Sequence, residues 1–249
     1  MRLGLGLGLT SPGVTGGRRP YTVGAKSYDG TNDFASKSGA NGANSKQFTF
    51  VCALNFSAPG TGLQWLWDVG TSRLAIYKSA TTGFVTVEGA NSGASNILNI
   101  RSNAGIHSLI GAWGVLMISL DMSDANKRHI YLGHTSLGVT ATTYTNDTLN
   151  LASDYEFATR QGGVNKLAAC AAHLWWADGV YTDLSVEANR RKFIDAAGKP
   201  ISLGNQGQGP TGAQPRVFAP NGDPSTNLGS VGNFTITGAL TDCASSPTD

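Results

Sequence analysis

The sequence feature that most restricts the fold is a strict two-residue alternation of side chains. The segment Gln47–Phe56 reads QFTFVCALNF, and its larger apolar residues occupy every second position. Successive side chains of a β-strand point to opposite faces, so this period is typical of a half-buried strand. Residues 57–60, Ser-Ala-Pro-Gly, end the run with turn formers. At least part of the core is therefore expected to be built from β-sheet.

Similar short runs recur along most of the chain. They lie at residues 21–23, 26–28, 63–69, 73–77, 83–88, 113–120, 129–132 and 166–177. Clusters rich in Gly, Ser, Thr and Asn separate them, and the polar stretch 89–105 is expected to be a long loop or a weak strand pair. Gly accounts for 33 of 249 residues and charged residues for only 14%, which excludes coiled coils and charged helical bundles. The pattern predicts an all-β fold with one main domain.

A single helix is expected near the end of this domain. Ser185 is a suitable N-cap, and Glu187 lies in the first turn, where its negative charge opposes the helix dipole. Gly198 is a typical residue just beyond a helix C-terminus. We expect a helix of about three turns between Ser185 and Gly198.

The chain divides into three regions. Residues 1–20 form an N-terminal arm, residues 21–197 the domain, and residues 198–249 a Gly- and Pro-rich extension with one late strand at Asn233–Leu240. Leucines alternate with glycines in the arm and share one side of an extended strand: Leu3, Leu5, Leu7 and Leu9. The arm is either a disordered terminus or an assembly arm that adds as a strand to a neighbouring subunit. Its short, Gly-rich apolar stretch does not resemble a signal peptide, so a mature segment is expected.

Several segments carry a family resemblance through their order along the chain. They are Ser27–Phe34 (SYDGTNDF), Trp113–Asp121, His129–Gly133, Leu167–Asp178 and Thr182–Glu187. Together they resemble the concanavalin A-like jelly roll in its laminin-G-like form, over about residues 20–197. The resemblance implies a jelly-roll β-sandwich with one short C-terminal helix and extended N- and C-terminal tails.

The extension carries a second resemblance. Phe193–Pro200, a Gly-Pro-Thr-Gly stretch and Gly232–Thr241 are similar to the tail of laminin-G-like proteins from tailed bacteriophages and prophages. This resemblance implies a structural protein of the virion that contacts other virion proteins and forms a homo-oligomer, a trimer or a larger symmetric assembly. A tail or fibre position is favoured, because sugar-binding folds suit host recognition. A capsid head decoration or cementing protein and a free lectin-like glycan-binding module are the alternatives.

Four tryptophans are the candidate contacts to a host-surface glycan or to a partner subunit: Trp65, Trp67, Trp175 and Trp176. Exposed Trp is enriched at binding surfaces. The period of two puts Trp65 and Trp67 on one strand face. The adjacent Trp175 and Trp176 point to opposite faces, so one of them faces solvent, a loop or a partner. Packing in the core or between subunits is the alternative interpretation of all four.

Metal and cofactor chemistry has little support in the sequence. Asp121, Asp124 and Asn126 lie in one polar turn and are a weak calcium candidate, although such oxygens more often only form the turn. His129 and His134 lack the spacing of zinc ligands on one face and are expected to be structural. We expect no cofactor.

The cysteines and the charge limit the compartment and the partners. Cys52, Cys170 and Cys243 are odd in number and widely spaced, which predicts no disulfide framework. Cys52 and Cys170 lie in apolar runs and are expected to be small buried side chains. The net charge of +2 predicts no nucleic-acid partner. The chain has no apolar run of about 18 residues, which predicts no membrane insertion.

The pattern of carboxylates does not indicate an enzyme. The glutamates are Glu88, Glu156 and Glu187, which lie far apart in the sequence. The segment Asp154–Glu156 lacks the second Glu of a laminarinase-type catalytic strand. No GxSxG elbow, HExxH motif or phosphate-binding loop occurs. We therefore expect no enzymatic activity, because a glycoside hydrolase needs two carboxylates in one cleft.

Overall fold

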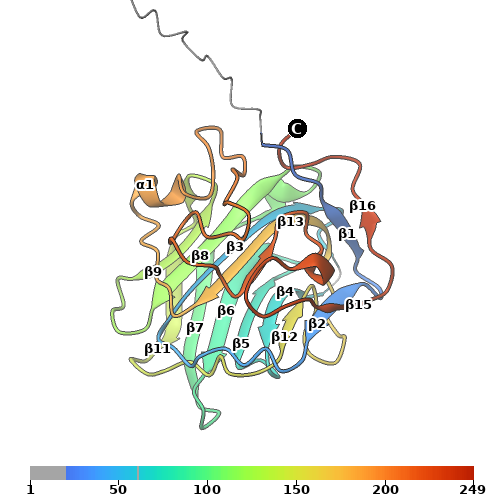
Figure 1. Cartoon of the computed structure of the whole chain (residues 1–249). Coiled ribbons are helices and arrows are strands. Elements are labelled where there is room, and N and C mark those ends of the chain that lie inside the picture. Colours follow the sequence, from blue (N-terminus) through green and yellow to red (C-terminus); the bar gives the residue numbers. More distant parts are fainter. Residues whose placement is uncertain (1–20, 61) are drawn as a thin grey trace, which may run out of the picture.

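Two antiparallel β-sheets lie face to face and form the centre of the described structure (Figure 1). The computed structural model describes residues 21–60 and 62–249, so the predicted assembly arm with Leu3, Leu5, Leu7 and Leu9 lies outside the described residues. The prediction of an all-β jelly-roll sandwich is confirmed. Within the described ranges, no helix has the length and apolarity needed to cross a lipid bilayer.

The first sheet, called sheet A, contains eight strands. In spatial order they are β10 (Thr135–Ser136), β9 (Arg128–Leu132), β8 (Gly114–Asp121), β3 (Gln47–Phe56), β13 (Ala168–Asp178), β1 (Lys26–Asp29) and β16 (Thr241–Asp242), with β14 (Val217–Ala219) paired to β13. The alternating segment Gln47–Phe56, which most restricts the fold, is therefore a central strand of this sheet.

Sheet B also contains eight strands. Their order is β11 (Val139–Tyr144), β7 (Asn96–Gly105), β6 (Phe84–Ala90), β5 (Leu74–Lys78), β4 (Gln64–Val69), β12 (Tyr155–Phe157), β2 (Phe34–Lys37) and β15 (Thr235–Thr237). The helical elements are the 3-10 turns η1 (His107–Leu109) and η2 (Pro224–Thr226) and the helix α1 (Glu187–Arg190).

Strand β7 corrects the interpretation of the polar stretch 89–105. It is a strand of 10 residues between β6 and β11, where a loop or weak strand pair was expected. Leu98 and Ile100 point into the core, whereas Asn99 and Arg101 lie on the opposite, solvent-facing side. The polar residues that suggested a loop thus occupy one face of a half-buried strand.

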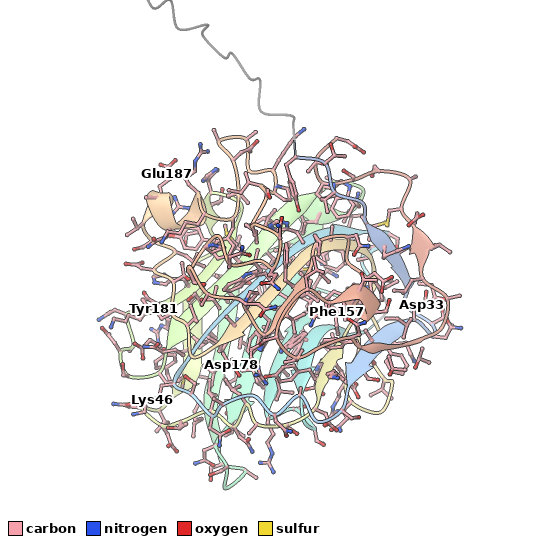
Figure 2. All side chains as sticks on the ribbon, in the orientation of Figure 1. Asp33, Lys46, Phe157, Asp178, Tyr181 and Glu187 are labelled. Carbon is pink, nitrogen blue, oxygen red and sulfur yellow. A yellow bond between two sulfur atoms is a disulfide. The ribbon has the colours of Figure 1, made fainter. Side chains whose placement is uncertain are left out.

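The space between the sheets is filled with aromatic and branched apolar side chains. Trp176 of sheet A meets Phe48 and Trp67 at ring-centroid distances of 5.0 Å and 5.3 Å. Phe157, labelled in Figure 2, packs edge-on against Tyr28 at 5.2 Å. Burying each such side chain stabilises the fold by roughly 1.5–3 kcal/mol, so this layer holds the two sheets together.

Sheet A buries its outer face as well. A second apolar cluster lies there, and its larger members include Val51, Met117, Trp175, Phe193, Leu203 and Phe218. Trp175 packs against Phe193 at 5.3 Å, and its indole Nε1 donates a hydrogen bond of 2.8 Å to the Gly207 carbonyl. Trp175 and Trp176 therefore point oppositely as expected. Trp176 faces the core between the sheets and Trp175 faces a loop.

The C-terminal region 198–249 belongs to the sandwich, which corrects the prediction of a separate extension, although β15 does lie within the late strand predicted at Asn233–Leu240. In Figure 1 this region, orange to red, crosses the outer side of sheet A. Its short strands pair β14 with β13, β16 with β1 and β15 with β2, so it joins both sheets. Arg216 anchors it, because its Nε lies 3.6 Å from Oδ2 of Asp178, which Figure 2 labels.

A disulfide between Cys170 and Cys243 corrects the prediction that no disulfide forms. The sulfur atoms are 2.09 Å apart, and the Cα atoms are separated by 6.1 Å. Strand β1 lies between the two cysteines, because Ser27 pairs with Cys170 on one side and with Thr241 on the other. The bond spans 73 positions of sequence, which no local spacing rule could have revealed. Cys52 is a buried free thiol, as expected.

The helix is one turn long, so the expected three turns are wrong. It covers Glu187–Arg190, and its N-cap is Val186 with no side-chain hydrogen bond. The hydroxyl of Ser185, the expected cap, donates to Asp183 Oδ1 at 2.6 Å. Phe193 is buried in the outer cluster on sheet A. Beyond α1 the chain continues in hydrogen-bonded turns, in which the Phe193 and Ile194 backbone N–H groups both donate to the Arg190 carbonyl.

Candidate functional site

The outer face of sheet B carries the candidate site, because side chains from several strands form a polar hollow there. The hollow has a volume of about 300 Å³ and is lined by Tyr77 from β5, Thr86 and Glu88 from β6, Asn99 and Arg101 from β7, and Thr140 and Thr142 from β11. The registers place Glu88 directly opposite Asn99, and Thr86 directly opposite both Tyr77 and Arg101. Alternation on four neighbouring strands thus gathers these groups on one surface.

Glu88 is the centre of the hydrogen bonding in this hollow. The Tyr77 hydroxyl donates to Glu88 Oε1 at 2.8 Å, and Asn99 Nδ2 donates to the same oxygen at 3.2 Å. Burial and the neighbouring Glu88 carboxylate raise the pKa of Tyr77 well above its usual range, so its hydroxyl keeps its proton and remains a donor at neutral pH. Both bonds reach Oε1, and Oε2 is the oxygen that an incoming hydroxyl group would meet.

Aromatic rings border the hollow. Trp65 stacks on Tyr77 with a centroid distance of 4.4 Å and an interplanar angle of 16°. The Arg160 guanidinium lies 5.7 Å from the centre of a Trp65 ring. On the other side, the Arg101 guanidinium lies 4.8 Å from the centre of the Phe84 ring. Cation–π contacts of this kind hold long arginine side chains in defined positions.

The loop 159–166 covers the part of this face next to β4. The backbone N–H of Gln161 donates to Asp68 Oδ2 at 2.8 Å, and that of Ser72 donates to Oδ1 at 3.0 Å. Asp68 is buried, and burial raises the pKa of its carboxyl group. The loop is therefore pinned beside the hollow and leaves β5, β6, β7 and β11 open.

Glu156 is not as isolated as its position in the sequence suggests. The register places it directly opposite Asp68 on one side and Ser36 on the other. Burial, and secondarily the Asp68 carboxylate, raise the pKa of Glu156 to about 7. A carboxyl pair of this kind is not arranged like a hydrolytic pair, because Asp68 is fully buried with both oxygens bonded to backbone N–H groups.

The four tryptophans proposed as contact residues are buried. The exposed fraction is 5% for Trp65 and 0% for Trp67, Trp175 and Trp176, so these rings offer no free face for a sugar, which corrects that prediction. Trp65 and Trp67 also do not share a face. A β-bulge lies between them, so Trp65 stacks on Tyr77 outside while Trp67 enters the core.

The calcium candidates form a hydrogen-bonded turn. Asp121 Oδ1 accepts from the Ser123 hydroxyl at 2.6 Å, and Oδ2 accepts from Gln47 Nε2 at 2.8 Å. Asp124 Oδ1 accepts from the Asn126 backbone N–H at 2.9 Å. Across residues 21–60 and 62–249, no group of three or more His, Cys, Asp or Glu side chains is arranged to hold a metal ion.

The two histidines considered as ligands have other partners. His129 Nε2 lies 2.8 Å from the Tyr181 hydroxyl, and His134 Nε2 lies 2.8 Å from the Asp195 carbonyl oxygen. Both contacts tie a strand or turn of sheet A to the segment that leads into and out of α1. The structural interpretation of these histidines accounts for both contacts.

The sequence did not single out Tyr77, Glu88, Asn99 or Arg101. The sequence presents Glu88 only as an isolated carboxylate, and it places Asn99 and Arg101 in a long loop or a weak strand pair. Their shared surface depends on the cross-strand registers between β5, β6 and β7, which a single sequence does not display. The alternation of Phe84, Thr86 and Glu88 was the available signal, because it marks one face of β6.

Comparison with known proteins identifies the fold. No family model and no curated protein matches this chain. Among solved structures, a carbohydrate-binding protein from Bacteroides ovatus, itself described as putative, matches with a TM-score of 0.62 and 11% identity, over 89% of this chain and 59% of that one. A heptameric SAP-like pentraxin from Limulus polyphemus matches with a TM-score of 0.54 and 10% identity, over 88% and 94%.

Mouse laminin α1 domains LG4–5 match with a TM-score of 0.45 and 11% identity, over 61% of this chain and 40% of that one. This chain spans 59% of the length of the Bacteroides protein. The chain has a jelly-roll fold of the concanavalin A-like type. At such low identities the likeness concerns the fold.

Proposed function

We propose that this chain is a non-catalytic saccharide-binding protein that serves as a structural component of a phage virion, in the tail or fibre. The single observation that carries the binding function is the hollow on sheet B, where Glu88, Tyr77 and Asn99 form one hydrogen-bonded group. The Bacteroides protein of similar fold, described as a putative carbohydrate binding protein, supports the same class of ligand.

The chemistry of the hollow suits a sugar. Sugar hydroxyl groups both donate and accept hydrogen bonds, and the hollow offers a carboxylate acceptor, an amide and the hydroxyls of Thr86 and Thr142. Ordered polar groups fixed on four strands lose little conformational entropy on binding. A volume of about 300 Å³ has room for one or two sugar rings at the low end of the range of small-molecule sites.

The absence of catalysis is part of the proposal. Glu88 has no second carboxylate directly opposite it, because its register partners are Asn99 and Ala75. Glu156 and Asp68 do form a carboxyl pair on this sheet, but Asp68 is fully buried, so a substrate does not reach it. Binding without bond cleavage is therefore the activity that this surface supports.

A glycan array tests the binding function. We expect the full chain to bind at least one class of glycan, and Tyr77→Ala and Glu88→Gln to lose most of that signal because each removes part of the same group. Glu187→Gln is the matched control, since Figure 2 shows Glu187 on the short helix, at the margin of the molecule. Lack of binding to every glycan, or equal loss in the control, would refute the proposal.

The virion role rests on the sequence resemblance to phage laminin-G-like proteins and on the Leu-Gly arm. The similarly folded pentraxin is heptameric, which supports a symmetric homo-oligomer here. Deleting residues 1–15 is expected to abolish incorporation into particles while the domain still folds. Normal incorporation of the truncated chain would overturn the role of the arm.

The copy number per particle separates the two virion positions. A small multiple of three or six copies supports the tail or fibre, whereas hundreds of copies support a head decoration protein. If purified particles do not contain this chain, the virion role fails and the free lectin-like glycan-binding module is supported instead.

A further inference from the structure

We propose that the hollow on sheet B selects a saccharide residue that carries a carboxylate, such as a hexuronate or a sialate, and that Arg101 binds this carboxylate. This inference rests on the proposed saccharide-binding function and adds the chemical class of the ligand. It follows from a difference between the two charged side chains of the hollow: Glu88 has hydrogen-bond partners within the chain, whereas Arg101 has no ion-pair partner among the described residues.

Glu88 is largely satisfied within the protein, and Arg101 is not. Glu88 Oε1 accepts from both Tyr77 and Asn99. Among residues 21–60 and 62–249, the ion pairs do not include Arg101. The Arg101 side chain is exposed, and its described contact is with the face of the Phe84 ring. The ring fixes the position of the cation without neutralising its charge.

The neighbours of Arg101 leave room for an anion. Its register partners are Thr86 on β6 and Thr140 on β11, which are both neutral. The Thr140 hydroxyl donates to Asn103 Oδ1 at 2.6 Å, so this hydroxyl is directed away from Arg101 as a donor. An anion that approaches Arg101 from the β11 side therefore meets no carboxylate there.

The position of Glu88 fixes the orientation of the ligand. Glu88 lies two residues along β6 from Thr86, the register partner of Arg101, so Glu88 and Arg101 are diagonal neighbours on adjacent strands, with Glu88 on the strand nearer β5. A carboxylate beside Glu88 would be repelled, whereas hydroxyl groups there can donate to Glu88 Oε2. The ligand thus places its carboxylate toward β11 and its hydroxyl groups toward β5.

A guanidinium group favours a planar carboxylate as its partner. Its N–H donors form a flat fork that matches the two oxygens of a carboxylate, and the pair makes two parallel hydrogen bonds. A polyanionic ligand fits less well, because its remaining charges would extend toward Glu88. The single arginine and the single glutamate of the hollow therefore match a sugar with one carboxylate and several hydroxyl groups.

The experiment compares ligands that differ only in that charge. Galacturonic acid, which carries one carboxylate, and its methyl ester have the same sugar skeleton, and an array of glycans with one terminal sialate and of their desialylated forms makes the same comparison. We expect the charged member of at least one pair to bind more tightly. Arg101→Ala should weaken its binding roughly tenfold or more, because a charge-assisted hydrogen-bonded pair is lost. Arg101→Lys should restore part of the loss, since it keeps the charge without the fork.

Arg128→Ala is the matched control variant. Arg128 also lies over an aromatic ring, that of Tyr144 at 5.3 Å, but it is on β9 of sheet A. Equal weakening by Arg128→Ala would indicate a general charge effect and overturn the role of Arg101. Thermal melting of every variant separates a loss of binding from a loss of folding.

The outcomes distinguish this inference from the proposed function. If neutral glycans bind as tightly as charged ones, and Tyr77→Ala abolishes both, the carboxylate class is wrong and saccharide binding stands. If no glycan of either kind binds, the proposed function itself fails. If charged glycans bind, and the Arg101 variants and Tyr77→Ala lose them while Arg128→Ala does not, both are supported.

Discussion

The outer faces of the two sheets differ although each sheet contains eight antiparallel strands. On sheet A, Val51, Met117 and Trp175 are buried in the cluster that the C-terminal region helps to cover. On sheet B, Glu88 and Arg101 stay partly or fully open to solvent. Both faces are formed by the outward side chains of alternating strands. They differ because the outward side chains of sheet A are largely apolar and are covered by a further layer of chain, whereas those lining the hollow of sheet B are mostly polar. The covered face supplies stability, and the open face supplies polar chemistry.

The largest expected effect on stability comes from the covered face. Trp175→Ala leaves a cavity between sheet A and the C-terminal region and removes the hydrogen bond to the Gly207 carbonyl. We expect the free energy of unfolding to fall by about 3–5 kcal/mol, measured by urea denaturation. Tyr77→Ala on the open face should cost clearly less. Equal costs for the two variants would break the comparison.

The disulfide gives the next largest effect. Cys243→Ser releases β16 from β13, and we expect the free energy of unfolding to fall by about 2–4 kcal/mol. Thermal melting with and without a reducing agent checks this. Reduction should lower the melting temperature of the natural chain to that of the variant and leave the variant unchanged. A natural chain insensitive to reduction would contradict the structural role of this bond.

Glu156 gives a smaller effect that depends on pH. Its pKa in the folded chain is raised from 4.5 to about 7, so ionisation is costlier in the folded state than in the unfolded one. Stability is therefore lost as the pH rises from about 4.5 to about 7. Glu156→Gln should be about 1 kcal/mol more stable at pH 8, after discounting for the partial exposure of this carboxyl group, and unchanged at pH 4. Urea denaturation at both pH values measures this, and an equal gain at both would contradict it.

The smallest effect is expected for the ion pair between Lys26 and Asp242. Their charged atoms are 2.7 Å apart, but the Asp242 side chain is 86% exposed. Water and salt screen such pairs, so Asp242→Asn should change the free energy of unfolding by no more than about 0.5 kcal/mol. A larger loss by urea denaturation would mean that β16 depends on this charge as well as on the disulfide.

The sandwich was predictable because its inward positions alternate along each long strand. Gln47–Phe56 shows this pattern without reference to any partner strand. In the C-terminal region the sequence predicts a strand at Asn233–Leu240, which contains β15, but β14 has 3 residues and β16 has 2, too few to show a period. Their pairing depends on tertiary contacts that the local sequence does not encode.

The candidate site was less predictable than the fold. Trp65 and Trp67 are two apart, yet a bulge places them on opposite faces, and sequence spacing alone does not reveal a bulge. Glu88 and Asn99 meet only because β6 and β7 pair in one register. A one-residue slip would turn every outward side chain of β7 into the core, so the site is a property of registration.

The strand β1 has a mechanical consequence. Its residues pair with β13 on one side and with β16 on the other, and the bond between Cys170 and Cys243 joins these two neighbours. The backbone N–H of Cys243 also donates a hydrogen bond to the Ala25 carbonyl, just before β1 begins. Tension applied to the chain ahead of Tyr21 would act along β1, and two ladders closed by one covalent link would share the load. Strand β1 can therefore leave sheet A only if its pairing with both neighbours breaks.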